Sequence, residues 1–394
     1  MDQRAFYRRN IKYTVLNGFF WMAVCPISSF AGFFLLSSSC SNPEIGLVLA
    51  ISGVTTILAQ LLTARLADRA KKVSPDVFIS ALTAAAILVC LGLLLARNHK
   101  YLLCGLYILL LTLCNALQPL VSGYAFYLER LQTPIVYGLA RGVGSVTYSL
   151  MAGALGKISA QLGAPAVPTA SMIFFAPMLA VLYLLRLEGR PAESTARAKL
   201  IRPAAAPRAG CSLVLLVGIG TLFFGVGICN NFLIQIVQAF HGSVESFGTL
   251  SMFGSFACAL GVFLYIWVKQ KLSCARILCI SSAVFFLQIA LRYCAPSLGW
   301  LYAIAVLSVF SDGWIYTSLV DLANELMPAE YCVRSQARMT VAMTVGGILA
   351  CALGGVMLDR LSIRGTLLAA SCLTLAGLFL IVLGLKAARP VRAA

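Results

Sequence analysis

Twelve long hydrophobic runs recur along this 394-residue chain, and they constrain its fold more than any other feature. Each run is about 20 residues long, which is the length that an α-helix needs to cross the hydrocarbon core of a bilayer. Hydrophobic residues make up 60% of the sequence and charged residues only 11%, so a soluble fold would be unable to bury its apolar surface. We therefore expect an all-α membrane protein.

The twelve segments fall into two sets of six. The first set covers residues 13–36, 45–64, 75–96, 101–126, 135–160 and 167–186, and the second covers 211–238, 246–268, 275–294, 299–322, 335–358 and 364–386. Residues 188–210 between them are rich in Pro, Ala and Arg and lack apolar periodicity, which indicates a cytoplasmic linker. The sequence thus predicts twelve transmembrane helices in two pseudo-symmetric six-helix bundles, 1–187 and 211–394, or eleven helices if one short pair is re-entrant.

The net charge of +17 comes from basic residues that lie between the segments. About 23 of the 30 Lys and Arg lie in alternate connections and at the two ends, which is the pattern of cytoplasmic loops. Few Lys and Arg lie in the remaining connections, which would be on the outer side, and Lys157 and Arg292 lie at the border of these connections. We expect both termini on the cytoplasmic side of a cell (inner) membrane, and we expect the partner of the chain to be the lipid bilayer and not a nucleic acid.

The cysteines and histidines give no sign of a metal or cofactor. Most of the 14 cysteines lie inside apolar runs without close CxxC pairs, and only two histidines are present. We expect no metal site, no cofactor and no disulfide framework. The sequence also lacks a GxxxxGK[ST] loop, an HExxH motif and any Ser/His/Asp or paired-carboxylate constellation in its spans, which disfavours an ATP-driven pump and an enzyme.

Asp312 is the one acidic residue near the middle of a predicted segment. A charged side chain inside a bilayer is costly, and a carboxyl group can take up and release a proton. Asp312 is therefore a candidate proton-coupling residue, and the alternative is a structural acid that is paired or permanently protonated. Asp321 follows near the inner end of the same segment.

Arg141 is the only basic residue deep inside a predicted segment. Its guanidinium group offers five donors in a planar fork, which suits hydroxyl pairs, carboxylates and phosphates. Ser145 and Tyr148 follow at i+4 and i+7 on the same helix face, and Tyr148 offers an aromatic surface to a ring. We expect these three residues to bind a solute. The alternative is an arginine that extends to the inner interface.

Uncharged polar residues form stripes on further segments. The fourth segment carries Asn115, Gln118 and Ser122 on one face. The seventh segment carries Asn231 and Gln235, and the first carries Trp21 with Asn17. Such stripes either line a water-filled cavity or bond neighbouring helices. Because they recur in both halves, we expect them to line a central cavity and to contact a solute.

The connection after the second segment reads AQLLTARLADRAKK, residues 59–72. Its Leu66, Ala67, Asp68 and Arg69 and its basic end resemble the motif Gly-x-Leu-Ala-Asp-Arg-x-Gly-Arg-Arg of the major facilitator superfamily, with alanine at both glycine positions. In that superfamily the loop tunes the change between inward- and outward-facing states. The resemblance implies this gating role for Asp68 and Arg69, and it implies the major facilitator fold.

Two further stretches resemble the lactose permease and nucleoside–proton symporter group of this superfamily. YGLARGVGSVTY (137–148) is similar to the fifth helix of the permease, and residues 311–338 are similar to a pattern on its tenth and eleventh helices. The resemblance implies that Arg141 binds sugar hydroxyls, that Tyr148 stacks on the sugar ring, and that Asp312 takes the position of a coupling histidine. Three permease glutamates are replaced here, by Ser122, Ile315 and Ser255.

The sequence and the resemblance together predict a secondary transporter, monomeric as the family implies, that moves a sugar, glycoside or nucleoside with protons. Two other transport modes stay open: efflux of amphipathic or cationic compounds by proton antiport, and uncoupled uniport. A membrane-embedded enzyme or a sensor is disfavoured, since neither a catalytic constellation nor a signalling domain is evident.

Overall fold

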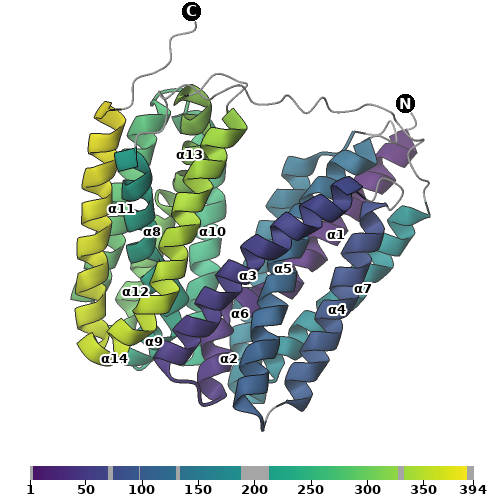
Figure 1. The fold of residues 1–394 in the computed structure, drawn as a ribbon, viewed down its shortest axis with the longest axis horizontal. Helices are drawn as coiled ribbons and strands as arrows, with labels where there is room; N and C mark the ends of the chain where they lie inside the picture. The colour runs from purple at the N-terminus through teal and green to yellow at the C-terminus, as the bar shows by residue number, and fades with distance from the viewer. Residues whose placement is uncertain are drawn as a thin grey trace, which may run out of the picture. The chain divides into compact units, whose positions relative to one another are not determined.

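The structure, a computed structural model, describes residues 3–69, 74–96, 98–129, 134–187, 213–326 and 332–387. Within these ranges all regular structure is helical (Figure 1). The predicted linker, 188–210, lies outside the described residues. The prediction of an all-α fold is confirmed.

The helices of the N-terminal half lie close to the predicted segments. They are α1 (Gln3–Ser29), α2 (Ala31–Ser37), α3 (Asn42–Arg69), α4 (Pro75–Leu95), α5 (Lys100–Glu129), α6 (Tyr137–Leu162) and α7 (Ala166–Arg186). α1 and α2 correspond to one predicted segment, which is broken at Phe30 and bent by 49°. α1 also starts before the predicted residue 13, because hydropathy marks only the apolar part of a helix.

The helices of the C-terminal half differ more from the prediction. They are α8 (Leu213–Asn231), α9 (Leu233–Ala239), α10 (Val244–Val268), α11 (Cys274–Cys294), α12 (Leu298–Ala305), the 3₁₀ helix η1 (Val306–Val309), α13 (Asp312–Leu326) and α14 (Cys332–Ala387). The predicted segment 211–238 is divided at Phe232, and the predicted segment 299–322 is divided at η1. A continuous apolar run carries no signal of such breaks.

α14 is too long to be one span. Its 56 residues amount to about 84 Å, nearly three times the thickness of the hydrocarbon core. Ser362 inside it has φ 61° and ψ 172°, which is non-helical, so α14 comprises two helices joined at this residue. These two parts correspond to the predicted segments 335–358 and 364–386.

The number of spans is consistent with the prediction. Nine of the described segments are long and apolar enough to cross a membrane, or ten when α1 and α2 count as one broken span. α6, which carries Arg141 and several serines, is not one of the ten. With α6 and the second part of α14 added, the described residues are consistent with twelve spans.

The chain divides into two compact units. The first comprises Met1–Cys40, Ile51–Ala196 and Ser243–Met252, and the second comprises Ser41–Ala50, Arg197–Gly242 and Phe253–Ala394. In the first unit, α1 packs against α6 and α7, and α4 packs against α5 and α7. In the second unit, α8 and α11 pack against α14, and α11 packs against α13. These contacts fix the helices that carry the candidate site residues.

Small residues permit the closest of these helix contacts. Gly377 of α14 lies so near α8 that a Cβ atom there would be 2.5 Å from the backbone nitrogen of Leu222. Helices in lipid gain little from the hydrophobic effect, so close backbone packing supplies much of their association. α8 and the last part of α14 therefore have a defined register.

Candidate substrate and coupling site

In the first unit, α1 and α6 approach closely at a glycine. Gly144 of α6 faces Trp21 and Asn17 of α1, and a Cβ atom at this position would lie 2.3 Å from the Trp21 ring. Only glycine fits this contact without a shift of the neighbouring ring. The close approach puts the Trp21 indole beside the face of α6 that carries Arg141, one turn before Gly144.

Arg141 stacks on the Trp21 ring. Its Cζ atom lies 4.2 Å from the ring centroid, and its Nη1 donates a hydrogen bond to Ser145 Oγ at 2.9 Å. A guanidinium group on an indole face gains roughly 0.5–2 kcal/mol, more when water is excluded. The arginine is therefore held between α1 and α6 and does not extend along its own helix alone.

Tyr148 completes this group. Its ring meets Trp21 edge to face, with centroids 6.0 Å apart, and its hydroxyl lies 2.7 Å from Ser29 Oγ. The structure thus brings together four residues that the sequence nominated for solute binding. We call Trp21, Arg141, Ser145 and Tyr148 the Arg141 cluster.

The polar stripe of α5 contacts residues outside the Arg141 cluster. Ser122 Oγ accepts a hydrogen bond from Tyr137 of α6 at 3.2 Å, and Asn115 Nδ2 donates one to Thr56 of α3 at 3.5 Å. The Gln118 side chain is exposed. These contacts join α5 to neighbouring helices and do not involve the Arg141 cluster. They fit the alternative that the stripe bonds helices to one another.

In the second unit, Asp312 lies where a transmembrane segment is broken. α12 ends in η1, and Asp312 is the first residue of α13. The Ser308 hydroxyl of η1 bonds the Asp312 carboxylate. The sequence placed Asp312 in the middle of a continuous helix. The break instead sets its carboxylate beside hydroxyl groups and the first turn of a new helix, where a negative charge is favoured.

Two side chains of α11 complete the surroundings of Asp312. Gln288, only 2% exposed, donates through Nε2 to Ser308 Oγ at 3.2 Å and accepts a bond from Ser311 Oγ at 2.9 Å. Arg292, one turn further along α11, interacts electrostatically with Asp312 and bonds the Cys229 thiol of α8. We call Gln288, Arg292, Ser308, Ser311 and Asp312 the Asp312 cluster.

Sequence reasoning missed the role of Arg292. It counted this residue at the margin of an outer connection, whereas Arg292 lies in the last turn of α11. A signal was present, because Gln288 and Arg292 are four residues apart and so share one face of an amphipathic pattern. Charge counting alone favoured the loop.

Asn231 and Gln235 form hydrogen bonds with residues outside the Asp312 cluster. Asn231 ends α8 and donates to Cys351 Sγ of α14 at 3.0 Å. Gln235 of α9 donates to Asn42 Oδ1 at 3.3 Å, within the same unit. Neither contact involves Asp312.

The other predicted functional element lies at the end of α3. The backbone of α3 continues to Arg69, but the side chains of Asp68 and Arg69 lie outside the described part of the structure. Their gating role stays a prediction. Among the described residues, no three His, Cys, Asp or Glu side chains are grouped as a metal site would require.

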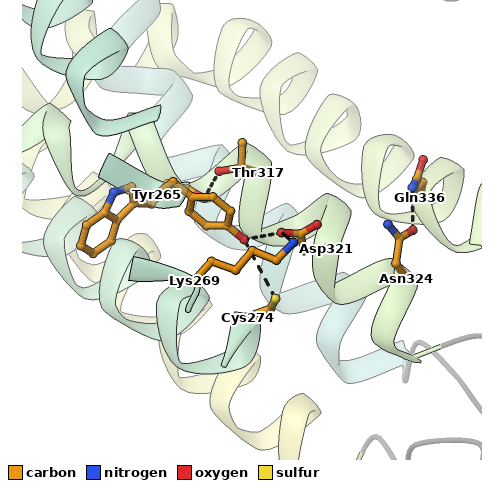
Figure 2. Close-up of polar contacts among 8 residues, drawn as sticks. Tyr265, Lys269, Cys274, Thr317, Asp321, Asn324 and Gln336 are labelled. Atoms are coloured by element: carbon orange, nitrogen blue, oxygen red, sulfur yellow. Dashed lines mark hydrogen bonds and ion pairs between the residues drawn. The ribbon is translucent and has the colours of Figure 1, made fainter. Parts of the chain in front are cut away.

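A further polar group joins α10 and α13 (Figure 2). Lys269 Nζ lies 2.6 Å from Asp321 Oδ2, and the Tyr265 hydroxyl donates to the same oxygen at 2.8 Å. The hydrogen bond to the Asp321 carboxylate raises the pKa of Lys269 above its usual value. We call Tyr265, Lys269 and Asp321 the Lys269 cluster. The sequence marked Asp321 as a residue at the inner end but assigned it no partner.

The family follows from a family model that matches most of the sequence. The model of the MFS_1 like family matches residues 11–369. The chain belongs to this family. The prediction of a major facilitator transporter, made from the AQLLTARLADRAKK motif and the 6+6 pattern, is confirmed.

Solved structures show the same fold at low sequence identity. The nucleoside transporter NupG has a TM-score of 0.72 and 13% identity, covering 96% of this chain and 99% of its own. The D-xylose–proton symporter has a TM-score of 0.71 and 11% identity, covering 98% and 99%. A bacterial homologue of the iron transporter ferroportin has a TM-score of 0.70 and 13% identity, covering 96% and 98%. No curated protein sequence matches the chain.

These neighbours share the fold of this chain, but they carry different cargoes. A nucleoside transporter, a sugar symporter and a homologue of an iron transporter share the fold about equally well. Function in such a fold depends on the site residues and not on the architecture. By its family and its apolar helices, this protein is a multi-pass membrane transporter of the major facilitator type.

Proposed function

We propose that this transporter is a proton-coupled symporter of a small polar solute: a sugar, a glycoside or a nucleoside. The observation that carries the proposal is Asp312, a carboxylate at a helix break inside a membrane-spanning segment, bonded to Ser308 and within electrostatic reach of Arg292. A carboxylate inside a bilayer is energetically costly, so a residue of this kind is a candidate for a role in transport. Protonation removes its charge, so Asp312 can carry one proton across.

The Arg141 cluster binds the solute in this proposal. Arg141 supplies a fork of donors to oxygen atoms of the solute, and Tyr148 and Trp21 supply aromatic surface for a sugar or base ring. Hydroxyl-rich solutes fit this set because each hydroxyl accepts from the guanidinium group. A cationic drug does not, because Arg141 repels it.

The two halves move as bundles in this proposal. Residues 1–187 and 211–394 rock to expose the site to each side in turn, as repeat-built transporters do. Both termini face the cytoplasm of a cell membrane, since the excess of Lys and Arg lies on that side. The transporter works as a monomer.

Solute-driven proton movement in liposomes tests the proposal. Purified protein is reconstituted, sugars and nucleosides are added in turn, and external pH is recorded with wild type, Asp312→Asn and the control Glu245→Gln. Glu245 is an exposed acid in the first turn of α10. We expect alkalinisation with one solute that Asp312→Asn abolishes and Glu245→Gln preserves, while solute binding survives in both.

Two outcomes contradict this function. Tracer exchange without proton movement, unchanged in Asp312→Asn, means uniport and returns Asp312 to a structural role. Acidification of the external medium when amphipathic cations are added outside the liposomes means that protons leave as the cations enter. This result indicates an antiporter of the kind that serves efflux.

A further inference from the structure

Two cysteines meet at one end of the first unit. Cys40 follows α2, and Cys104 lies in the first two turns of α5. Their Sγ atoms are 3.6 Å apart, and both residues are present as thiols. This pair is separated by 64 residues in the sequence, so spacing alone gave no hint of it.

The distance suits the formation of a bond. A disulfide has an S–S length of about 2.05 Å, so the two sulfur atoms have to approach by roughly 1.5 Å. Rotation of a cysteine side chain about its Cα–Cβ bond moves the sulfur over such a distance. The backbone on each side is tied down, since Cys40 N donates to Leu35 O at 3.1 Å and Cys104 lies within a helix.

The pair lies at the end of the unit that faces outward in the proposed topology. The chain first crosses the membrane through α1 and α2, and Cys40 follows directly after this crossing. Lys100 opens α5, which starts the return of the chain from that same side two spans later. The outer compartment is oxidising in most cells, whereas the cytoplasm keeps thiols reduced. The inference rests on the proposed orientation but not on the identity of the solute.

We propose that Cys40 and Cys104 form a disulfide bond on the outer face of the transporter. Cys104 is partly exposed and Cys40 is 4% exposed, which sets the order of the reaction. The Cys104 thiolate attacks one sulfur of a small soluble disulfide and releases one small thiol. The Cys40 thiolate then attacks Cys104 Sγ and releases the second. Two protein thiols are oxidised to one disulfide, and one small disulfide is reduced to two thiols.

The bond has a structural consequence for the wall of a cavity. Ser38 and Leu103, neighbours of the two cysteines, line a cavity of about 600 Å³ within the first unit. Phe34 and Ser159 also line this cavity, and the Ser159 hydroxyl is buried without a hydrogen-bond partner. The disulfide joins the α2 side of this wall to the α5 side. Oxidation therefore stiffens the cavity and closes a long loop of the chain.

Thiol counting on the full-length protein tests the proposal. Purified wild type is treated with oxidised glutathione, denatured, and alkylated, and the labelled thiols are counted by mass spectrometry. We expect two fewer of the 14 thiols to react after oxidation, and a peptide that joins Cys40 to Cys104. The thermal midpoint of the oxidised protein should rise by several degrees and fall back with reductant.

Three variants sharpen the test. In Cys40→Ser, Cys104 should form a mixed disulfide with one glutathione. In Cys104→Ser, the buried Cys40 should form none. The control Cys294→Ser removes an exposed thiol at the end of α11 and should still lose two thiols on oxidation. Unchanged thiol counts in wild type, or a loss of two that persists in either pair variant, would overturn the proposal. In whole cells, a membrane-impermeant disulfide should form the bond from outside, and failure there would overturn the outward placement while leaving the transport assay unaffected.

Discussion

The Arg141 cluster and the Asp312 cluster hold opposite charges in two different ways. Arg141 lies on an indole face and bonds a serine of its own helix, so an aromatic ring and one hydroxyl suffice for it. Asp312 lies at a helix break among Ser308, Gln288 and Arg292, which belong to two other segments. The cation is stacked, whereas the anion is surrounded by donors.

This difference suits the separate roles that we propose for the two units. A guanidinium group keeps its charge at any physiological pH, so Arg141 is a permanent donor suited to binding. A carboxylate gains or loses a proton, and the surrounding hydroxyl and amide groups can serve either form. The proposed function therefore assigns binding to the first unit and proton coupling to the second, and variants of each cluster should separate the two.

The largest effect is expected from Arg141→Gln. It removes the guanidinium donors that bond the solute, and a lost charge-assisted hydrogen bond costs up to about 3 kcal/mol, or roughly 100-fold in affinity. Solute binding, measured by scintillation proximity or calorimetry, should fall by that factor. Arg364→Gln, an exposed arginine of α14, is the control and should bind as wild type. Equal binding by Arg141→Gln would place the solute elsewhere.

A smaller effect is expected from changes to Trp21. Trp21→Leu removes the ring on which Arg141 rests and should weaken solute binding by about 10-fold, while Trp21→Phe, with a smaller ring, should weaken it less. Both variants should retain the ratio of protons to solute, because the Asp312 cluster is untouched. Flux measurements with pH dye and tracer check that ratio, and a changed ratio would mean that the two clusters do not act separately.

Gln288→Leu probes the other side of the comparison. It leaves the hydroxyls of Ser308 and Ser311 without their buried amide partner, at a cost of about 1–3 kcal/mol in the free energy of unfolding. The thermal midpoint should fall, and proton movement should slow, while the affinity for solute in equilibrium binding stays the same. The neighbouring Leu287→Ala is the control, since Leu287 is exposed on α11 and should leave proton movement unchanged.

The smallest effect is expected at the Lys269 cluster, which belongs to the same unit as Asp312 but is half-exposed. Because the Asp321 carboxylate raises the pKa of Lys269, the charged lysine stabilises the fold below its unfolded pKa of about 10.4. That contribution is lost as pH rises through the higher folded-state pKa. The difference in thermal midpoint between wild type and Lys269→Met should therefore be constant near neutral pH and disappear as the pH rises through the folded-state pKa of Lys269.

Much of the fold was predictable because a membrane forces a fixed helix length. The positions of most spans followed from hydropathy. Trp21 and Arg141 were nominated separately for solute binding, but their contact with each other was not predicted. The break before Asp312 was not predictable, since Val306–Val309 is as apolar as its surroundings. The interaction of Asp312 with Arg292 was missed for a different reason. The spacing of Gln288 and Arg292 indicates a shared helix face, but the residues that this face meets depend on tertiary packing.

The turn at Ser362 makes the last two spans sensitive to chain length. One residue carries the change of direction, with helix on both sides and no loop to absorb an added residue. An insertion here would turn the final span by about 100° about its axis. Gly377 would then leave Leu222, and a bulkier side chain would meet the backbone of α8 in its place. Substitutions in this region change single contacts, whereas insertions and deletions change the phase of an entire helix.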